Sequence, residues 1–467
     1  MTSIHQLPTE VLDNILRYLD NGRPSFPPIK GRKEKEDLRN LCLASKQLLP
    51  RIQAYLYSSF WITDPSRTWT IRAFLRTILC RPSLAVHVKK VVLCTWRAWD
   101  RASDATNESL YDTKRKSLTW SDQMLFQRAA TSFALPERDH WHKLIGENND
   151  EVYVAFLLLV LPNLRELIIH APSKSPILSM ALQHATILPP AAEMGLQRLE
   201  KVYYEVRGGN RLCGDLAEVA PFFCIPSIRS IEISGWLSPI ASSSQIVSGQ
   251  SDLIHLNVRY GGAEPSIIGD ILRSTPHLES FHYSHGYLNE LPPLRFNPRA
   301  FGDALRITKH SLKILKLSTD ARNIVDTSPY SHNLGTLRDF SRLEELYVSF
   351  EVLLGPSLPI DLVNVLPPSI VHIKVEDFDG AWSSLYCEEL VYCLVELFEQ
   401  RQDRTPRLYK VAADYMPNRP NRNKRSKRAI VTHIEAAMHA AIVLEDFEWG
   451  KLRHQDPRLW LYKEGWI

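Results

Sequence analysis

The sequence has few cysteines and no long apolar run. Its seven cysteines are scattered through 467 residues and form no C-x-x-C pair, which excludes a disulfide framework and the usual spacing of a zinc site. The longest apolar stretch, 152–161, is far shorter than the ~20 residues that span a bilayer. The first residues show no basic region followed by an apolar run, so no secretory signal is expected. We therefore expect a protein of the cytoplasm, the nucleus or both, with reduced cysteines and no membrane contact.

The sequence also lacks a strong net charge and the motifs of common enzyme sites. The formal net charge is only +4, and without a concentrated basic face a nucleic-acid partner is not expected. The one dense basic run, at 419–428, is interpreted as a solvated loop, with a nuclear-import signal or an anion-binding patch as the alternative. No phosphate-binding loop, nucleophile elbow or dinucleotide-binding turn is present. We therefore predict no catalytic residue, no cofactor and no metal, and we do not expect an enzyme.

Three short helices are predicted in the first sixty residues. The first begins at Leu7-Pro8-Thr9-Glu10, because proline suits the first helical turn and Glu10 suits the positive end of the helix dipole. After a polar stretch the second helix begins near Glu36, and Pro50 opens the third. The apolar residues at helical spacing are Val11, Leu12, Ile15, Leu16 and Leu19, then Leu38, Leu41, Cys42, Leu48 and Leu49, then Ile52, Tyr55, Leu56 and Phe60. Their number exceeds what so small a bundle can bury, so the segment is either a cap on the following domain or a docking module.

The same segment resembles an F-box motif. The matching letters are L-P-x-E-V-L-x-x-I-L-x-x-L and D-L-x-x-L-C-L-A-S-K-x-L, followed by a helix that ends in an aromatic pair, over roughly 4–62. The match departs from the motif in a long insertion between the first two helices, which is similar to that of fungal members of the family. The resemblance implies docking on the Skp-type adaptor of a cullin–RING ubiquitin ligase, with the cullin bound through the adaptor. The adaptor contacts that it implies are Leu7, Pro8, Val11, Leu12, Ile15, Leu16, Leu19, Leu38, Leu41, Leu43 and Leu48.

One unit recurs from residue 84 to 415, with the core Leu-x-x-Leu-x-apolar. Clear copies start at 164, 199, 228, 253, 278, 312, 343 and 370, which are 25 to 35 residues apart, and weaker copies start at 88 and 408. Helical stretches are predicted between copies, at 151–160, 266–273, 300–308 and 387–399. The spacing overlaps that of leucine-rich repeats, in which each strand-and-helix unit buries its apolar face only by stacking on its neighbours.

The predicted fold class is therefore α/β: an N-terminal three-helix F-box followed by a curved leucine-rich-repeat solenoid, with parallel strands on the concave side and helices outside. A solenoid of helix pairs is the alternative, which the Ile-x-Ile and Val-x-Tyr strings disfavour because β-branched and aromatic residues prefer strands. The predicted domains are the F-box at 1–62, the repeats at 84–415 with a polar insertion near 95–142, and a C-terminal part at 416–467. That last part holds the basic loop, a capping helix at 429–444 and a tail rich in tryptophan and tyrosine.

Alternate residues of each repeat strand should face away from the core. The target-binding residues predicted on this face are Ile168, His170, Tyr203, Glu205, Glu232, Asn257, Arg259, His282, Lys316, Tyr347, His372 and Lys374. Any one of these positions is more often simply solvated, so only the whole row is a binding hypothesis. Its mixture of tyrosine, histidine and charge favours a protein target over a small molecule.

Three functional hypotheses follow. In the first, the protein is the substrate-recognition subunit of an SCF-type ubiquitin ligase and acts by proximity, holding a target near the catalytic arm. In the second, it is a repeat scaffold that binds partners without a role in ubiquitination. The third, an enzyme with a site on the concave face, would need clustered ionisable residues that the row does not show.

Overall fold

The protein is described by a computed structural model that divides into two compact units. Unit 1 consists of Met1–Gly209 with Gly214–Ile231, and unit 2 of Asn210–Cys213 with Glu232–Ile467. The residues that the structure describes are 7–20, 35–62, 68–94, 96, 118–133, 135–172, 175–187, 195–207, 216–235, 251–285, 296–319, 333–349, 352–353, 362–376, 393, 396–397, 399–414 and 459–461.

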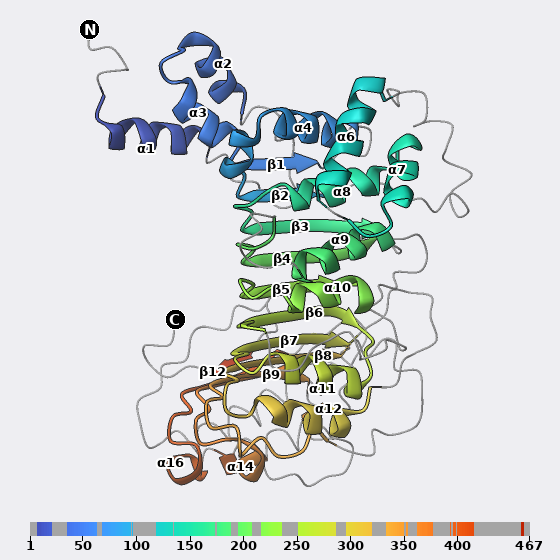
Figure 1. Cartoon of the computed structure of the whole chain (residues 1–467). Coiled ribbons are helices and arrows are strands. Elements are labelled where there is room, and N and C mark those ends of the chain that lie inside the picture. The colour runs from blue at the N-terminus through green and yellow to red at the C-terminus, as the bar shows by residue number, and fades with distance from the viewer. Residues whose placement is uncertain are drawn as a thin grey trace, which may run out of the picture. The chain divides into compact units, whose positions relative to one another are not determined.

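Unit 1 holds three N-terminal helices and the first strands of the repeats (Figure 1). Its elements are α1 (Thr9–Asp20), α2 (Glu36–Ala44), α3 (Leu49–Leu56), β1 (Ser59–Ile62), α4 (Trp69–Cys80), the 3-10 helix η3 (Pro82–His87), β2 (Lys90–Leu93), α6 (Trp120–Ser132), α7 (Arg138–Gly146), α8 (Asp150–Leu159), β3 (Glu166–Pro172), α9 (Pro176–Ile187), β4 (Lys201–Arg207) and α10 (Leu216–Phe223). Strand β5 (Ser230–Ser234) crosses the boundary between the units.

Unit 2 continues the alternation of strands and helices. Its elements are β6 (His255–Gly261), α11 (Pro265–Ser274), β7 (Ser280–His285), α12 (Pro298–Leu305), the 3-10 helix η7 (Arg306–Thr308), β8 (Ile314–Thr319), β9 (Glu345–Ser349), α14 (Leu362–Val365), β10 (His372–Glu376), α16 (Arg401–Arg404), β11 (Lys410–Asp414) and β12 (Leu459–Leu461). Strand β12 pairs antiparallel with β11, so it covers the outer edge of β11 that would otherwise present unpaired backbone groups.

The strands pair in parallel and in chain order within each unit, as the repeat spacing predicted. In unit 1, β1 pairs with β2, β2 with β3 and β3 with β4. In unit 2, the parallel order runs from β6 to β11. The copies predicted as weak, at 88 and 408, also form strands, β2 and β11.

A repeated backbone contact starts successive strands. The carbonyl of Lys89 accepts hydrogen bonds from two consecutive amides, Arg165 N at 2.8 Å and Glu166 N at 3.0 Å. The same pattern recurs in unit 2, where the carbonyl of Glu279 accepts from Lys313 N and Ile314 N. In this way the carbonyl of the residue just before a strand accepts from two backbone amides of the next repeat. This fixes the register between neighbouring repeats.

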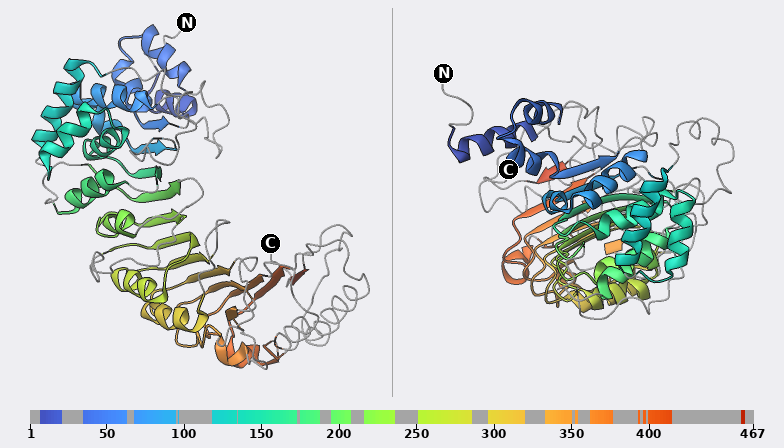
Figure 2. Two further views of the ribbon diagram at one scale, coloured as in Figure 1. Left: turned by 90° about the vertical axis from the view of Figure 1, so that its right-hand side faces the viewer. Right: turned by 45° about the horizontal axis from the view of Figure 1, so that its top comes forward.

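The core lies between the sheet and the helices, which cover one face of the strands in each unit (Figures 1 and 2). The first leucine or isoleucine of every copy is at most 1% exposed. These residues are Leu164, Leu199, Ile228, Leu253, Leu278, Leu312, Leu343, Ile370 and Leu408. Aromatic side chains join strand to helix, as in the Phe281 and Phe301 rings, whose centroids are 6.1 Å apart.

Some helices begin where the sequence supplies a capping side chain, as α8 and α12 do. The side chain of Asn149 accepts a hydrogen bond from Glu151 N at 2.8 Å at the start of α8. At α12, Asn297 accepts from Ala300 N at 3.0 Å and Pro298 occupies the first turn. Such caps satisfy backbone donors that a helix cannot pair internally.

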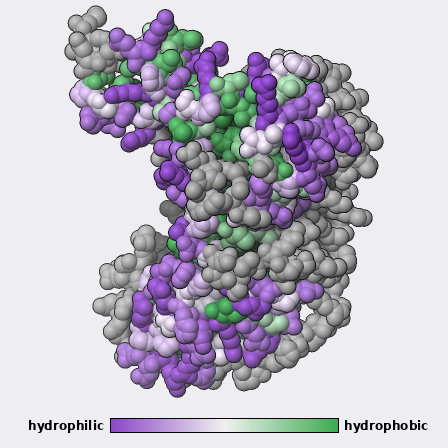
Figure 3. Space-filling model, viewed as in Figure 1, coloured by the Kyte–Doolittle hydropathy of each residue, from purple (hydrophilic) through white to green (hydrophobic). Residues whose placement is uncertain are grey.

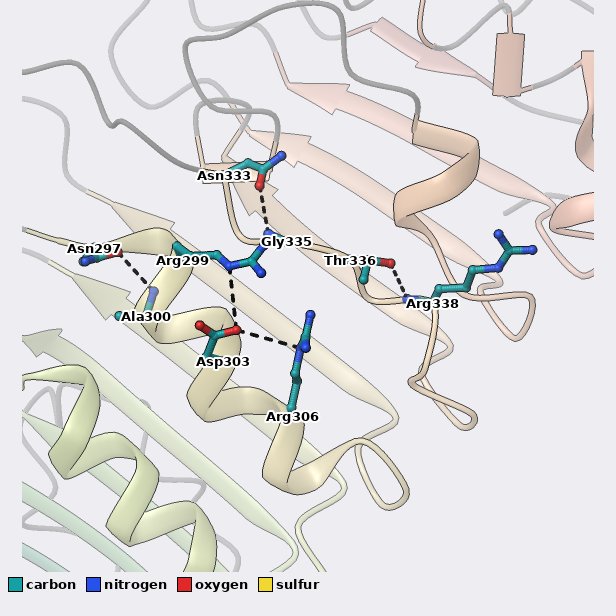
Figure 4. Close-up of polar contacts among 9 residues, drawn as sticks. All are labelled: Asn297, Arg299, Ala300, Asp303, Arg306, Asn333, Gly335, Thr336 and Arg338. Carbon is teal, nitrogen blue, oxygen red and sulfur yellow. Dashed lines mark hydrogen bonds and ion pairs between the residues drawn. The ribbon is translucent and has the colours of Figure 1, made fainter.

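The repeat between β8 and β9 packs a loop, 333–340, beside α12 (Figure 4). Gly335 has a φ of +85°, which favours glycine, and its amide donates to Asn333 Oδ1 at 3.1 Å. On α12 itself, Asp303 pairs with Arg299 at 3.7 Å and Arg306 at 3.9 Å. The loop approaches α12 so closely that a Cβ added to Gly302 would meet the Leu334 carbonyl oxygen at 1.9 Å.

The N-terminal helices agree with the predicted ones only in part. Leu48 and Leu49 were expected in the second helix, but α2 ends at Ala44 and Leu49 begins α3. Phe60 was expected in the third helix, but it lies in β1, whose partner is β2. The repeat sheet thus begins at Ser59, inside the range predicted as F-box. The Phe60 ring stacks on Phe74 of α4, with centroids 4.1 Å apart, so tertiary packing decides its conformation.

The range predicted as an insertion, near 95–142, contains helical structure. Helices α6 and α7 occupy much of its second half, and the Trp141 side chain is fully buried while Trp120 is 75% exposed. The Trp141 ring lies 5.2 Å from the Phe156 ring of α8, so this segment belongs to the core of unit 1. Trp99, the basic run at 419–428 and the helix predicted at 429–444 lie outside the described residues.

Candidate functional site

The face of the sheet turned away from the helices, here called the open face, is the candidate binding surface. Residues alternate along each strand between this face and the core. In β9, for example, Leu346 and Val348 are buried while Glu345 and Tyr347 are partly exposed. Because the register is regular, equivalent residues of neighbouring strands form rows across the sheet.

In unit 1 the central row of the open face is apolar and aromatic. It consists of Trp61, Val92, Ile168 and Tyr203, which are direct partners on successive strands. Val92 is fully buried, so Trp61, Ile168 and Tyr203 are the accessible members of this row. The row beside it carries charge: Lys90 pairs with Glu166 at 2.6 Å. The Lys90 ammonium group also lies 5.2 Å from the Trp61 ring, within the range of a cation–π contact.

A second polar group of unit 1 surrounds His170. Its Nε2 lies 3.4 Å from Glu205, and its ring centroid is 5.8 Å from that of Tyr203. The Tyr203 hydroxyl donates to the same carboxylate at 3.0 Å. His170 was predicted as a target contact, but it is only 3% exposed. It therefore orients Glu205 and Tyr203 and is itself out of reach of a target, which corrects the prediction.

In unit 2 the open face is rich in basic groups. We name the residues His255, Arg259, His282, Lys316 and Lys374 the basic row. His282, Lys316 and Lys374 lie on one line of direct strand partners that starts at Asn257 and includes Tyr347. Arg259 follows on β6, where the register shifts at a bulge, and it pairs with Glu232 at 2.8 Å.

The pKa of His282 reflects this surrounding. It is lowered from 6.5 to about 4, first because the ring is removed from solvent and then because Lys316, His255 and Arg259 repel a further positive charge. His282 is therefore neutral at pH 7, and its ring lies 3.3 Å from the Ser280 hydroxyl.

Tyr347 connects three strands of this face. Its hydroxyl donates to Glu345 at 3.1 Å and lies 3.3 Å from His372 Nδ1. The Lys316 ammonium group sits 4.2 Å from the centroid of its ring. Tyr347 thus contacts a carboxylate through its hydroxyl and a cation through its ring.

The structure places every predicted target-binding residue on the open face, with His170 as the buried exception. It also adds residues that sequence reasoning missed. Trp61 was assigned to a helix, although the string S-F-W-I of β1 has the β-branched and aromatic composition of a strand. Tyr260 is 40% exposed at the β6 bulge with a φ of +55°, and no pattern in the sequence predicted that conformation.

The N-terminal helices form a second candidate surface. Four of the predicted adaptor contacts, Leu12, Leu16, Leu38 and Leu48, are at most 4% exposed in a core that the helices close among themselves. These four are corrected from contact residues to core residues. Pro8, Val11 and Leu43 are exposed, while Leu7, Ile15, Leu19 and Leu41 are partly buried. Figure 3 shows hydrophobic side chains at the surface of these helices.

Tyr18 was missed as a candidate of this second surface. It is 81% exposed, and Leu43 is 77% exposed. Its position in the helix, two residues after Leu16, places it away from the internal core.

Within the described ranges, no group of histidine, cysteine, aspartate and glutamate side chains is arranged to hold a metal ion. Nor is any helix there long and apolar enough to cross a membrane. Of the described cysteines, Cys94 and Cys393 are buried and Cys80 is exposed.

The stacked strand-and-helix units and their patterned open face define a repeat protein of the solenoid class. The chain belongs to the leucine-rich repeat domain family, whose model matches residues 65–432. The match begins after α3, so it does not include the three N-terminal helices. No curated protein matches the chain significantly. A leucine-rich repeat domain indicates an interaction scaffold that binds other proteins.

Proposed function

We propose that the protein is the substrate-recognition subunit of an SCF-type ubiquitin ligase. In this role α1–α3 dock on a Skp-type adaptor, the adaptor recruits a cullin, and the open face holds a target protein. The chain itself does no chemistry and works in the cytoplasm, the nucleus or both. The target is modified because it is held at high effective concentration near the ligase.

The observation that carries the proposal is an apolar surface on a module whose core is already complete. Leu12, Leu16, Leu38, Leu48 and Ile52 close the core of the three helices. The exposed Val11, Tyr18 and Leu43 on the same helices are 42%, 81% and 77% exposed, and they are not needed for that core. Large apolar side chains gathered outside a finished core favour a partner surface over a simple cap.

The module is also firmly joined to the repeats, as an adaptor-docking arm requires. The Lys35 ammonium group donates to the carbonyls of Leu56 and Ser59, each at 2.8 Å. These bonds bridge α2, the end of α3 and the start of β1. A target held on the repeats of unit 1 would thereby be carried at a defined position from the adaptor.

The test is co-purification of a tagged full-length chain from cells, with the adaptor and the cullin measured by immunoblot. Val11→Asp and Leu43→Asp are expected to lose both, since a carboxylate placed in an apolar interface is costly to desolvate. Val86→Asp is the matched control, because Val86 is 44% exposed and lies outside the module. It should retain both partners.

The second candidate is a scaffold that binds partners without a role in ubiquitination. The family match covers the repeats and does not include the three N-terminal helices, and this favours the scaffold. In that case both aspartate variants and the control should recover other partners, and no sample should contain the adaptor or the cullin. This result would establish the scaffold and overturn the ligase role.

A further inference from the structure

The two units offer different chemistry on their open faces. The central row of unit 1 is Trp61, Val92, Ile168 and Tyr203, and its neighbouring charges are paired as Lys90 with Glu166. The open face of unit 2 carries Arg259, Lys316 and Lys374, besides the histidines at 255, 282 and 372. Among the described residues of this face, Glu232 pairs with Arg259 and Glu345 accepts a hydrogen bond from Tyr347. The described side chains of Arg259, Lys316 and Lys374 thus set three cations against two carboxylates.

We propose that the basic row binds an acidic segment of a partner protein, with Lys316, Lys374 and Arg259 contacting aspartate or glutamate side chains. The inference rests on the proposed target-binding role of the repeats and names the chemistry of the target. Charge complementarity carries it, because a row of cations is satisfied by a row of anions.

The spacing of the row favours separate carboxylates along an extended segment. Lys316 and Lys374 lie on β8 and β10, with Tyr347 of β9 between them. Neighbouring strands are about 4.8 Å apart, so their backbones are separated by about 10 Å. Phosphate groups are typically held by several convergent arginines. The basic row has one arginine, which already pairs with Glu232.

The same geometry disfavours nucleic acid. Bases bind protein surfaces by stacking on open aromatic faces. Here the Tyr347 ring is occupied by the Lys316 ammonium group at 4.2 Å, and its hydroxyl is held by Glu345.

His282 supports the inference from inside the row. It lies between Lys316 of β8 and the residues His255 and Arg259 of β6. Removal of the ring from solvent is the main cause of its lowered pKa of about 4, and repulsion by these three neighbours lowers the pKa further, which shows that positive charge gathers around the ring. An incoming carboxylate relieves this repulsion.

The experiment is fluorescence polarisation of the purified full-length chain with a fluorescein-labelled peptide of alternating glutamate and serine. We expect binding that Lys316→Ser or Lys374→Ser weakens about five- to tenfold, as for loss of a charge-assisted contact, and that Lys316→Arg restores. Arg338→Ser is the matched control, because it removes the same charge from an exposed loop residue beside α12 (Figure 4). It should bind as the wild type does.

Three outcomes would overturn the inference: no binding at low salt, equal weakening by Arg338→Ser, or tighter binding of an alanine–phosphoserine peptide or of oligothymidine than of the glutamate peptide. None of these measurements uses the adaptor. Failure here with the adaptor still recovered by co-purification would remove the acidic target and leave the ligase role. Loss of the adaptor with peptide binding intact would remove the ligase role and leave the acidic target.

Discussion

The ammonium group of Lys316 lies 4.2 Å from the centroid of the Tyr347 ring, and the two residues are direct partners on β8 and β9. The Tyr347 hydroxyl contacts Glu345 of its own strand and His372 of β10. One side chain thus fixes a cation, a carboxylate and a histidine from three strands. Lys316 owes its position in the basic row to this ring, since it would otherwise be a long flexible chain in solvent.

Substitution of Tyr347 should separate these contributions. Tyr347→Phe keeps the ring under Lys316 and loses the hydroxyl contacts, which should cost about 1 kcal/mol of unfolding free energy. Tyr347→Leu also loses the cation–π contact and should cost a further ~0.5–1 kcal/mol. Urea unfolding followed by circular dichroism measures both. Tyr18→Phe, at an exposed position, is the control and should leave the unfolding free energy unchanged. Equal loss in the Phe and Leu variants would contradict a role for the ring.

Binding of the glutamate peptide should tighten as the pH falls from 7 to 5. An anion beside His282 raises its pKa from about 4, so the complex holds more protons than the free chain does, and by linkage a lower pH favours the complex. The peptide itself stays ionised above pH 5.

The His282→Gln variant isolates the contribution of His282 to this pH dependence. Polarisation titrations at several pH values should give a shallower pH dependence for His282→Gln than for the wild type. Parallel profiles for the two proteins would show that His282 takes no part.

The sequence predicted the core of the repeats better than its surface. Leu164 and Leu278 were expected in the core because the spacing of leucines records burial directly, and both are fully buried. Trp61 was missed because a four-residue strand directly after a helix has too few residues to show a period of two. The surroundings of His282 depend on Lys316 and Arg259, which only the register of three strands brings together.

In the N-terminal helices, too, the sequence does not predict which apolar residues remain at the surface. Leu16 and Leu43 both fit the resemblance to an F-box, yet one is fully buried and the other 77% exposed. Helical spacing predicts that a face is apolar, but the angle at which three helices pack decides which part of that face remains outside.

Two glycines in neighbouring helices should respond in opposite ways to alanine. A Cβ at Gly302 of α12 would meet the Leu334 carbonyl oxygen at 1.9 Å, whereas the nearest atom to a Cβ at Gly269 of α11 is 3.7 Å away. Gly302→Ala must push the loop from the helix and should lose about 1–3 kcal/mol of unfolding free energy. Gly269→Ala should gain up to about 1 kcal/mol, because alanine is the better helix former. Urea unfolding of both variants checks the pair, and similar changes in both would show that the loop does not approach α12 this closely.

The buried carboxylate of Glu151, a residue of α8 that contacts the start of α9, should make the stability of the protein depend on pH. Glu151 Oε1 accepts hydrogen bonds from Ile177 N at 2.8 Å and Leu178 N at 3.0 Å. Burial nevertheless raises its pKa from 4.5 to about 7, against the lowering effect of these two bonds. The folded chain therefore binds more protons than the unfolded chain between pH 4.5 and 7. Stability is full below this interval and falls as the pH rises through it, by about 3 kcal/mol in total.

Glu151→Gln tests this assignment, because glutamine keeps an oxygen for both amides and cannot ionise. The variant should match the wild type near pH 4.5, where Glu151 is protonated, and exceed it in unfolding free energy above pH 7. Glu147→Gln, at an exposed position nearby, should follow the wild-type profile. Urea unfolding across this range gives the comparison for all three proteins. If the wild type and Glu151→Gln lost stability in parallel as the pH rose, another group would be responsible and Glu151 would be ionised throughout.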